Sequence, residues 1–355
     1  MRGWFTGRKE RSGLHPAAAV GLDVLLTGVI LLIYLFFNQG APAMYAALGL
    51  QREPAPTPSA ATLPTAVPTA EAAGSAEPAV SPSPEADNRT EWQKRFADHF
   101  SDTVVLTDNS YTSPNVSITI DTVEETEGRN KAVYYVADIY IASPENFRTC
   151  TANNELQYYS RQDAMEMDMA AGALLSISGD FYAFQRTGFL IRNGEVYRQD
   201  YAYCDICVMY EDGSVENYAP GEYDIDEIMA RGVAQVWNFG PSLLDAEGHV
   251  YESYNVATAV SYPNPRSAFG YYEPGHYCFV VVDGRQENGS RGMTIPQLAA
   301  VFERLGCASA YNMDGGGSAL MVFNHQRFSS QSNGADRRLS DLLVIVETEG
   351  IKCSF

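Results

Sequence analysis

Three consecutive glycines separate two apolar runs in residues 311–323 (YNMDGGGSALMVF), and this is the segment most suggestive of chemistry. Glycine has no Cβ, so successive amides can approach an anion without steric hindrance. Asp314 opens the turn as a candidate catalytic carboxylate. The candidate substrate-binding residues of the turn are Asn312, Gly315, Gly316, Gly317 and Ser318. A glycine-rich hairpin capped by Asp314 would explain the same letters without a function.

Polar residues also stand where other apolar runs end. Asp180 follows the run LLSISG, and Asn238 and Gly240 interrupt the apolar stretch VWNFGPSLL. Arg266 lies between a proline-rich loop and a strand, where its planar, permanently charged guanidinium could bind phosphate oxygens. Asp180 and Asp314 form the best carboxylate pair among these positions.

The charge of the chain excludes several function classes. The 355 residues include 24 basic and 44 acidic side chains, which gives a net charge of −20. Residues 91–355 carry 18 of the basic and 37 of the acidic side chains, so this part alone has a net charge of −19. Such acidity argues against binding to nucleic acid, and a phosphorylated substrate would need a local cationic site. An apolar fraction of 45% excludes wholesale disorder.

The N-terminal residues predict a membrane anchor. Residues 1–16 form a basic tail, residues 17–37 an apolar run interrupted only by Asp23, and residues 38–90 a linker rich in Pro, Ala and Ser. About 20 apolar residues span a bilayer, and a basic flank stays in the cytoplasm. We expect a single-pass cell-membrane protein whose residues 91–355 form an extracellular domain. A cleaved signal ending near the small residues Ala41-Pro42-Ala43 is the alternative.

Residues 91–355 predict a mixed, strand-rich α+β single domain with a few helices. Alternating or β-branched runs indicate strands at 104–108, 116–121, 132–142 and 174–179, and hairpins turning at Asn193-Gly194 and Asp212-Gly213. Helices are expected at 154–172, 225–232 and 294–306. Because strands at 276–284 and 308–315 flank the last helix, we expect a strand–helix–strand crossover there.

The six cysteines are even in number and belong to an expected exported domain. We therefore expect at least one disulfide among Cys150, Cys204, Cys207, Cys278, Cys307 and Cys353. Cys204 and Cys207 could instead form half of a zinc site, although no second CxxC or paired histidine accompanies them. We expect no cofactor; a divalent cation is compatible with the acidity, but no EF-hand or HExxH pattern is present.

Taken in order, these segments resemble the bacterial branch of the phosphodiester glycosidase family over roughly residues 130–350. The resemblance rests on ISGDFYAF, TGFLIRNGEVYR, VWNFGPSLL, NPRSAFG, HYCFVVVDGRQ, GMTIPQLAAVFERLGCASAYNMDGGGSALM and SDLLVIV. Two departures stand out. Ala319 and Leu320 replace hydroxyl residues that usually follow the GGGS serine, and Ser178 stands where Asn is frequent.

The resemblance implies hydrolysis of the sugar C1–O bond of glycosyl-1-phosphodiesters of the N-acetylglucosamine-1-phosphate type, in envelope or exopolysaccharide glycans. It assigns the chemistry to Asp180, Asp314 and Arg266: one carboxylate would attack C1 or activate water, the other would orient it, and Arg266 would bind the phosphate. The separation of the two carboxylates cannot be deduced from the sequence, so retention and inversion both stay open. Glu273 and His276 lie near Arg266 in sequence and could serve as acid or base, or could be polar loop residues without a role. A non-catalytic polysaccharide-binding envelope protein and a metal-dependent phosphodiesterase remain the alternatives. The expected partners are the glycan substrate and the membrane, through residues 17–37.

Overall fold

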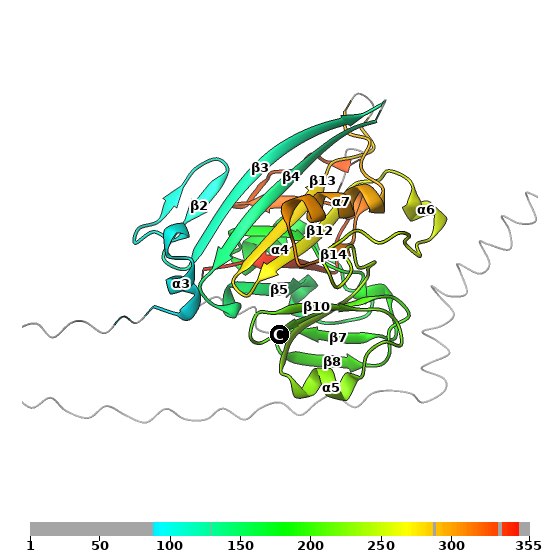
Figure 1. Ribbon diagram of the computed structural model, residues 1–355, viewed down its shortest axis with the longest axis horizontal. Coiled ribbons are helices and arrows are strands. Elements are labelled where there is room, and N and C mark those ends of the chain that lie inside the picture. Colours follow the sequence, from blue (N-terminus) through cyan, green and yellow to red (C-terminus); the bar gives the residue numbers. More distant parts are fainter. Residues whose placement is uncertain (1–86, 88, 129, 287–288, 333–335, 348–355) are drawn as a thin grey trace, which may run out of the picture. The chain divides into compact units, whose positions relative to one another are not determined.

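The computed structural model describes residues 87, 89–128, 130–286, 289–332 and 336–347. The basic tail, the apolar run and nearly all of the linker lie outside these residues. Among the described residues, no helix has the length and hydropathy of a membrane span. The described part has three sheets and a few helices (Figure 1), so the predicted strand-rich α+β class is confirmed for it.

The largest sheet has seven strands in the order β1-β2-β3-β4-β13-β12-β14, and every neighbouring pair is antiparallel. Its last two strands, β12 and β14, contribute residues to the cavity described below. In the order of the sheet, the strands are β1 (Val105–Leu106), β2 (Ser110–Thr112), β3 (Val116–Glu127), β4 (Asn130–Ile141), β13 (His276–Val282), β12 (Arg266–Glu273) and β14 (Ser309–Met313).

Two five-stranded antiparallel sheets complete the fold. One consists of β10 (Val215–Tyr218), β9 (Ile206–Tyr210), β11 (Val233–Asn238), β7 (Phe189–Arg192) and β8 (Glu195–Gln199), in this order. The other consists of β16 (Gln326–Arg327), β15 (Met321–Phe323), β6 (Leu175–Ser178), β17 (Asp341–Ile345) and β5 (Phe147–Thr151).

The three sheets share one apolar core and each is covered by a helix on its other face. The shared core joins side chains of all three sheets, including Phe279, Trp237 and Leu343. Helix α7 (Ile295–Leu305) covers the seven-stranded sheet, α4 (Ala164–Ala171) the β6-containing sheet, and α5 (Ile225–Ala230) the β9-containing sheet. The remaining α-helices are α3 (Glu91–Arg95) and α6 (Thr258–Ser261), and short 3-10 turns occur at 97–99, 144–146, 152–154, 182–184 and 316–318.

Helix α7 confirms the local signals read from the sequence. Thr294 caps it by accepting a hydrogen bond from the Gln297 amide, and Gly306 ends it in the left-handed conformation. Strands β13 and β14 on either side of α7 both pair antiparallel with β12, so they run parallel to each other. The expected crossover is therefore present, with β12 inserted between its two strands (Figure 1).

The hairpins at Asn193-Gly194 and Asp212-Gly213 are confirmed as β7–β8 and β9–β10. The helix expected over residues 154–172 is wrong for its first half, because α4 begins only at Ala164. Asn154 and Tyr159 have positive φ angles, which an α-helix cannot accommodate, and Asp163 caps the shorter helix instead.

Candidate active site

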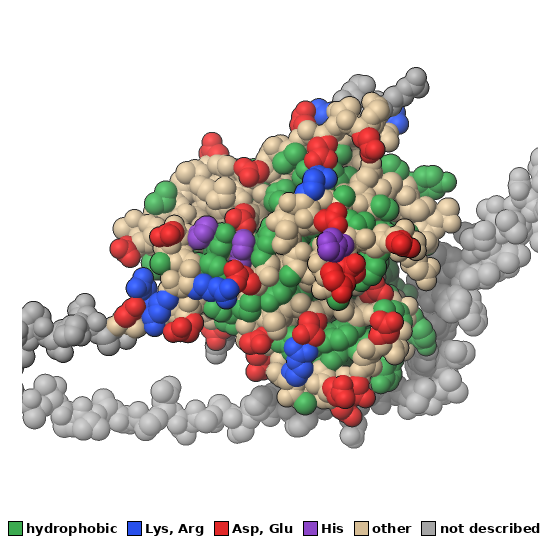
Figure 2. All heavy atoms as spheres, viewed as in Figure 1, with side chains coloured by type: hydrophobic (Ala, Val, Ile, Leu, Met, Phe, Trp, Pro, Cys, Tyr) green, Lys and Arg blue, Asp and Glu red, His purple; other side chains and the backbone are tan. Residues whose placement is uncertain are grey.

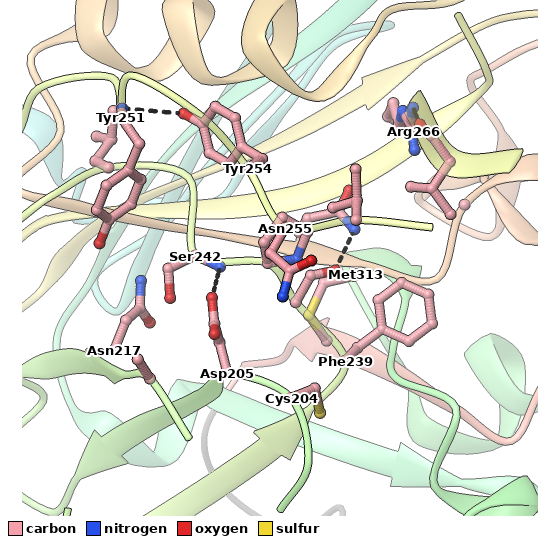
Figure 3. Close-up of a pocket in the computed structure, with 18 of the residues that line it drawn as sticks. Cys204, Asp205, Asn217, Phe239, Ser242, Tyr251, Tyr254, Asn255, Arg266 and Met313 are labelled. Atoms are coloured by element: carbon pink, nitrogen blue, oxygen red, sulfur yellow. Dashed lines mark hydrogen bonds between the residues drawn. The ribbon is translucent and has the colours of Figure 1, made fainter. Parts of the chain in front are cut away.

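A cavity of about 1120 Å³ opens beside the C-terminal end of β14. Its wall contains Arg266 of β12, Asn312 and Met313 of β14, the triple-glycine turn (residues 315–317) at Gly315 and Gly316, and the loop after β11. Figure 3 shows Arg266 on one side of this space, with Asp205, Asn217, Ser242 and Tyr251 grouped on the other. Of the residues predicted from the sequence, the cavity is lined by Gly240, Arg266, Asn312, Asp314, Gly315 and Gly316.

The triple-glycine turn brings its backbone against neighbouring chain where a side chain would not fit. A Cβ on Gly315 would lie 2.7 Å from the Pro265 carbonyl oxygen, and Gly316 has a φ of +63°. The amide of Gly316 donates to the Pro265 carbonyl over 2.9 Å, so it is not free for an anion as the sequence suggested. Gly317 and Ser318 are buried behind the cavity wall. The glycines therefore serve close backbone packing, which aims Asp314 into the cavity.

Asp314 contributes a half-buried carboxylate to the cavity wall beside the triple-glycine turn. Burial raises its pKa to about 6, and hydrogen bonding from Ser318 and the positive charge of Arg337 oppose that rise. Its backbone is held from both sides, because its amide donates to the Gly179 carbonyl over 2.9 Å and its carbonyl accepts from the Ser178 hydroxyl over 2.7 Å. A carboxylate with this pKa can act as a base or nucleophile at neutral pH and take up a proton just below it.

Arg266 is a buried cation held by neutral groups. Its side chain donates to the carbonyls of Met293 (2.9 Å), Val260 (2.6 Å) and Tyr262 (3.0 Å), and the residue is 4% exposed. Burial, reinforced by repulsion from Arg285, lowers its pKa to about 10, which leaves it charged at neutral pH. Among the described residues no carboxylate forms an ion pair with it, so its charge remains available for an anion in the cavity.

Two more arginines line this end of the cavity, and sequence reasoning missed both. Arg285 follows β13 and lies near Gly316, and Arg337 precedes β17 and lies near Gly317. Neither forms an ion pair within the described part of the chain. Figure 2 shows acidic side chains spread over the face in view, with Lys and Arg side chains gathered in a few places. We define Arg266, Arg285 and Arg337 as the arginine end of the cavity.

Asn312 and Asn238 connect the cavity to the adjoining sheet. The Asn312 amide group donates to the Gly240 carbonyl over 2.7 Å, and its buried Oδ1 has no hydrogen-bond partner in the described structure. Asn238 does not line the cavity; its side chain accepts from the Phe189 amide over 3.0 Å and so fastens β11 to β7. Gly240 itself lines the cavity at the turn that follows Asn238.

Asp180 lies behind the wall of the cavity rather than on its surface. The residue is 3% exposed, and its Oδ1 accepts from the Tyr182 amide (2.8 Å). Its Oδ2 accepts from the Asn238 amide (3.0 Å) and lies 2.7 Å from the Arg192 guanidinium. Arg192 also lies 2.8 Å from Asp341, and all three side chains are fully buried. We call Arg192, Asp180 and Asp341 the buried triad.

The buried triad contacts the segment that holds Asp314. The Gly179 amide donates to the Asp341 carbonyl over 3.0 Å, and the Gly179 carbonyl accepts from the Asp314 amide. A Cβ on Gly179 would lie 2.2 Å from Asp341 Oδ1, so this contact requires glycine. Burial and the neighbouring Asp180 raise the pKa of Asp341 well above its ordinary value, and the Arg192 charge opposes that rise.

Glu273 and His276 lie too far from Arg266 to serve the same site. They stand at the other end of the β12–β13 hairpin, and seven residues of strand separate Arg266 from Glu273 by about 23 Å. Glu273 forms an ion pair with Arg95, and His276 contacts Asp138 at 2.8 Å. Their closeness to Arg266 in sequence was misleading because an extended strand carries them away.

Within the described part of the chain no disulfide joins two of the cysteines Cys150, Cys204, Cys207, Cys278 and Cys307, and Cys353 lies outside that part. The Sγ atoms of Cys278 and Cys307 are 3.6 Å apart, which is beyond a disulfide bond length. Cys204 lines the cavity and Cys207 is buried in the shared core. In the described residues no three His, Cys, Asp or Glu side chains are grouped as a metal site.

Residues 171–346 match the sequence model of the phosphodiester glycosidase family, and this part of the chain belongs to that family. This segment contains every lining residue named above and all three residues of the buried triad.

Two relatives show how far the likeness extends. The uncharacterized SPbeta prophage-derived protein YomE of Bacillus subtilis (strain 168) is 27% identical over 162 residues, which are 44% of this chain and 25% of YomE. The chain thus spans about a quarter of that relative. The catalytic domain of zebrafish N-acetylglucosamine-1-phosphodiester alpha-N-acetylglucosaminidase, auto-inhibited by its pro-peptide, superposes with a TM-score of 0.54 at 19% identity, covering 69% of this chain and 88% of that domain. That likeness shows a shared fold.

Proposed function

We propose that this protein hydrolyses the sugar C1–O bond of glycosyl-1-phosphodiesters, of the type in which N-acetylglucosamine-1-phosphate is esterified to a second group. The observation that carries the proposal is the arginine end of the cavity, where three cations without carboxylate partners in the described structure line the same space as the half-buried Asp314. A phosphodiester supplies the anion that this arrangement lacks, and its anomeric carbon supplies the target for Asp314.

The arginine end acts on the phosphate. Arg266 lines the cavity and is held by three carbonyls, so its guanidinium can bind a phosphate at little entropic cost. Arg285 and Arg337 are exposed at the rim and can close on the other phosphate oxygen. As the C1–O bond breaks, negative charge grows on the departing phosphomonoester, and these cations stabilise that charge in the transition state.

Asp314 acts on the sugar. As a carboxylate it either attacks C1 or removes a proton from a water that attacks C1, and the electron pair of the C1–O bond leaves with the phosphate. The water oxygen ends on C1 and the phosphate keeps its original oxygens. Because a phosphomonoester is a good leaving group, the departing oxygen needs little help from a general acid. We assign Asp180 a positioning role, since it holds Asn238 and the backbone near Asp314 without reaching the cavity.

Replacing Arg266 with lysine keeps a positive charge and removes the planar fork. We expect kcat/KM for a glycosyl-1-phosphodiester to fall roughly tenfold to a hundredfold, the value of one charge-assisted hydrogen bond. The rate on an aryl glycoside of the same sugar, which has no phosphate, should change much less. An equal loss on both substrates would show that Arg266 supports the fold and does not bind phosphate.

We propose further that residues 17–37 anchor the protein in the cell membrane, with residues 91–355 outside and acting on envelope or exopolysaccharide glycans. The basic flank and the length of the apolar run support this topology. Protease added to intact cells stripped of their wall should digest the domain and leave a small membrane-bound fragment. Survival of the domain until the membrane is permeabilised would contradict this orientation.

A further inference from the structure

The cavity extends well beyond the arginine end, along the full length of β14. Ser309 and Met313, at the two ends of this strand, both line it, and they lie about 13 Å apart at 3.3 Å per residue. A volume of about 1120 Å³ lies above the range of about 300–1,000 Å³ typical of small-molecule pockets. The space therefore exceeds what one sugar and one phosphate require.

The end of the cavity remote from Arg266 is rich in groups that recognise sugars. We call Asp205, Asn217, Glu222, Tyr251 and Tyr254 the glycan lobe. Asn217 donates to the Ala310 carbonyl on β14 (2.9 Å). Tyr254 donates to the Leu243 carbonyl (2.6 Å), and the Leu243 amide donates to the same Ala310 carbonyl. Arg266 lies near Met313 at the other end of β14, because Ser267, the next residue on β12, pairs with Met313. The two ends are thus fixed at opposite ends of one strand, as Figure 3 also shows.

The glycan lobe offers hydrogen-bond acceptors and aromatic rings. The Oδ1 of Asn217 is buried without a hydrogen-bond partner in the described structure, and the ring of Tyr251 is 39% exposed. The Asp205 carboxylate is held in place by the Ser242 amide over 2.8 Å. Carboxylate and amide oxygens accept hydrogen bonds from hydroxyl groups, and amphipathic rings pack against the carbon faces of sugars.

A second cavity of about 370 Å³ adjoins the first and shares Tyr218 and Glu222 with it. Its wall adds Tyr210 and Tyr223 and the cation Arg231, whose charge is already paired with Glu216 at 2.8 Å. The extension therefore continues the aromatic and acidic character of the glycan lobe. It supplies room for sugars beyond the one attached to the phosphate.

The charges of the two ends differ in sign. The arginine end has three cations, whereas the wall of the glycan lobe contributes Asp205, Glu222 and the neighbouring Asp245. Fixed negative charges repel a phosphate and do not hinder neutral hydroxyl groups, which is how a site rejects one polymer while accepting another. A glycan with a phosphate on every repeat would place an anion against these carboxylates.

We propose that the substrate's sugar part is a neutral oligosaccharide, which lies in the glycan lobe while its single reducing-end phosphodiester lies at the arginine end. The enzyme then releases an oligosaccharide from its phosphate, and polymers with a phosphate on each repeat are excluded. This inference rests on the proposed function for the bond that is cut. The binding of a neutral oligosaccharide in the glycan lobe is independent of it.

The first experiment compares three synthetic methyl phosphodiesters with the intact protein. They carry N-acetylglucosamine, tri-N-acetylchitotriose, or the same trisaccharide bearing a phosphate on its non-reducing sugar. We expect kcat/KM to rise roughly tenfold or more from the first to the second, the value of two or three added hydrogen bonds, and to fall again for the third. Equal kcat/KM for all three would overturn the inference while leaving the proposed function intact.

Two substitutions test the glycan lobe itself. Tyr251→Ala should reduce the advantage of the trisaccharide severalfold, and Glu222→Gln should improve the third substrate relative to the second because it removes one repelling charge. The controls are Tyr159→Ala and Glu166→Gln, an exposed tyrosine and an exposed glutamate outside both cavities, which should leave both ratios at the wild-type values. Ratios that shift as much in the controls would contradict the assignment.

A binding measurement separates this inference from the proposed function. Titration calorimetry with phosphate-free tri-N-acetylchitotriose should detect binding to the wild type and weaker binding to Tyr251→Ala. Binding without hydrolysis of any phosphodiester would sustain the glycan lobe and refute the proposed reaction. No binding, together with hydrolysis of the monosaccharide substrate at an equal rate, would refute the glycan lobe alone.

Discussion

Replacing Asp314 with asparagine should lower kcat roughly 10²–10⁴-fold, the range typical of a lost acid, base or nucleophile, while substrate binding stays close to wild type. Asparagine has nearly the shape of aspartate, so the turn and its contacts with Gly179 and Ser178 should persist. Steady-state kinetics on a glycosyl-1-phosphodiester, with binding measured separately by calorimetry, would resolve the two effects.

The dependence of activity on pH should also report the ionisation of Asp314. The active form of Asp314 is the carboxylate, and its pKa is raised to about 6 by burial. Activity should therefore be full above this value and fall as the pH drops through it, tenfold for each further pH unit. In Asp314→Asn the remaining activity should lose this acidic limb, because the substitution removes the carboxyl whose pKa burial raises.

Asp168→Asn is the matched control for Asp314→Asn. Burial also raises the pKa of Asp168, but this carboxylate contacts Ser176 and His325 and does not line the cavity. It should keep the wild-type kcat and acidic limb, whatever its effect on stability. If Asp314→Asn keeps wild-type kcat, or if Asp168→Asn removes the acidic limb, Asp314 is not the reacting carboxylate.

Replacing Arg192 with methionine should cost about 3–5 kcal/mol of folding free energy, because it leaves Asp180 and Asp341 buried without their cation. For a domain of this size the expected loss in Tm is roughly 6–20 °C. Asp341→Asn should cost far less, because burial raises the pKa of Asp341 and so disfavours the negative charge that the substitution removes. Thermal and urea unfolding would measure both.

Arg304→Met is the control for Arg192→Met, because Arg304 forms a surface ion pair with Glu125 at 2.6 Å and is half exposed. Such pairs contribute about 0–1 kcal/mol. A loss for Arg192→Met no larger than that of the surface control would mean that the buried triad does not hold the fold together. Activity of refolded Arg192→Met should also fall, since the triad contacts the segment that positions Asp314.

Local signals in the sequence were sufficient for much of the fold. The Asn-Gly and Asp-Gly turns, the Thr294 cap and Gly306 determine short segments through backbone geometry alone, and all four are as predicted. The error over residues 154–163 has the opposite cause. Polar residues there could form a helix by propensity. The left-handed backbone at Asn154 and Tyr159 excludes a helix, and the Asp163 cap begins the helix only at Ala164.

The site could be predicted only in part from the sequence, because long-range strand pairing decides which strand ends meet. Arg266, Asp314 and the triple-glycine turn carried recognisable local patterns, and the structure brings them to one cavity. Arg285 and Arg337 follow no pattern of spacing and reach it only through the ends of β13 and β17. Asp180 looked equally suited to chemistry in the sequence. In the structure it is paired with Arg192, which also binds Asp341, 149 residues further along the chain, and no local pattern indicates that contact.

Hydrolysis of an N-acetylglucosamine-1-phosphodiester in water enriched with heavy oxygen tests the central claim most directly. If Asp314 acts at the anomeric carbon and the arginine end holds the leaving phosphate, the label must enter the released sugar, and the phosphomonoester must keep its original oxygens. Mass spectrometry of the two products reads the outcome. Label in the phosphate would place the attack at phosphorus and would make the protein a phosphodiesterase instead.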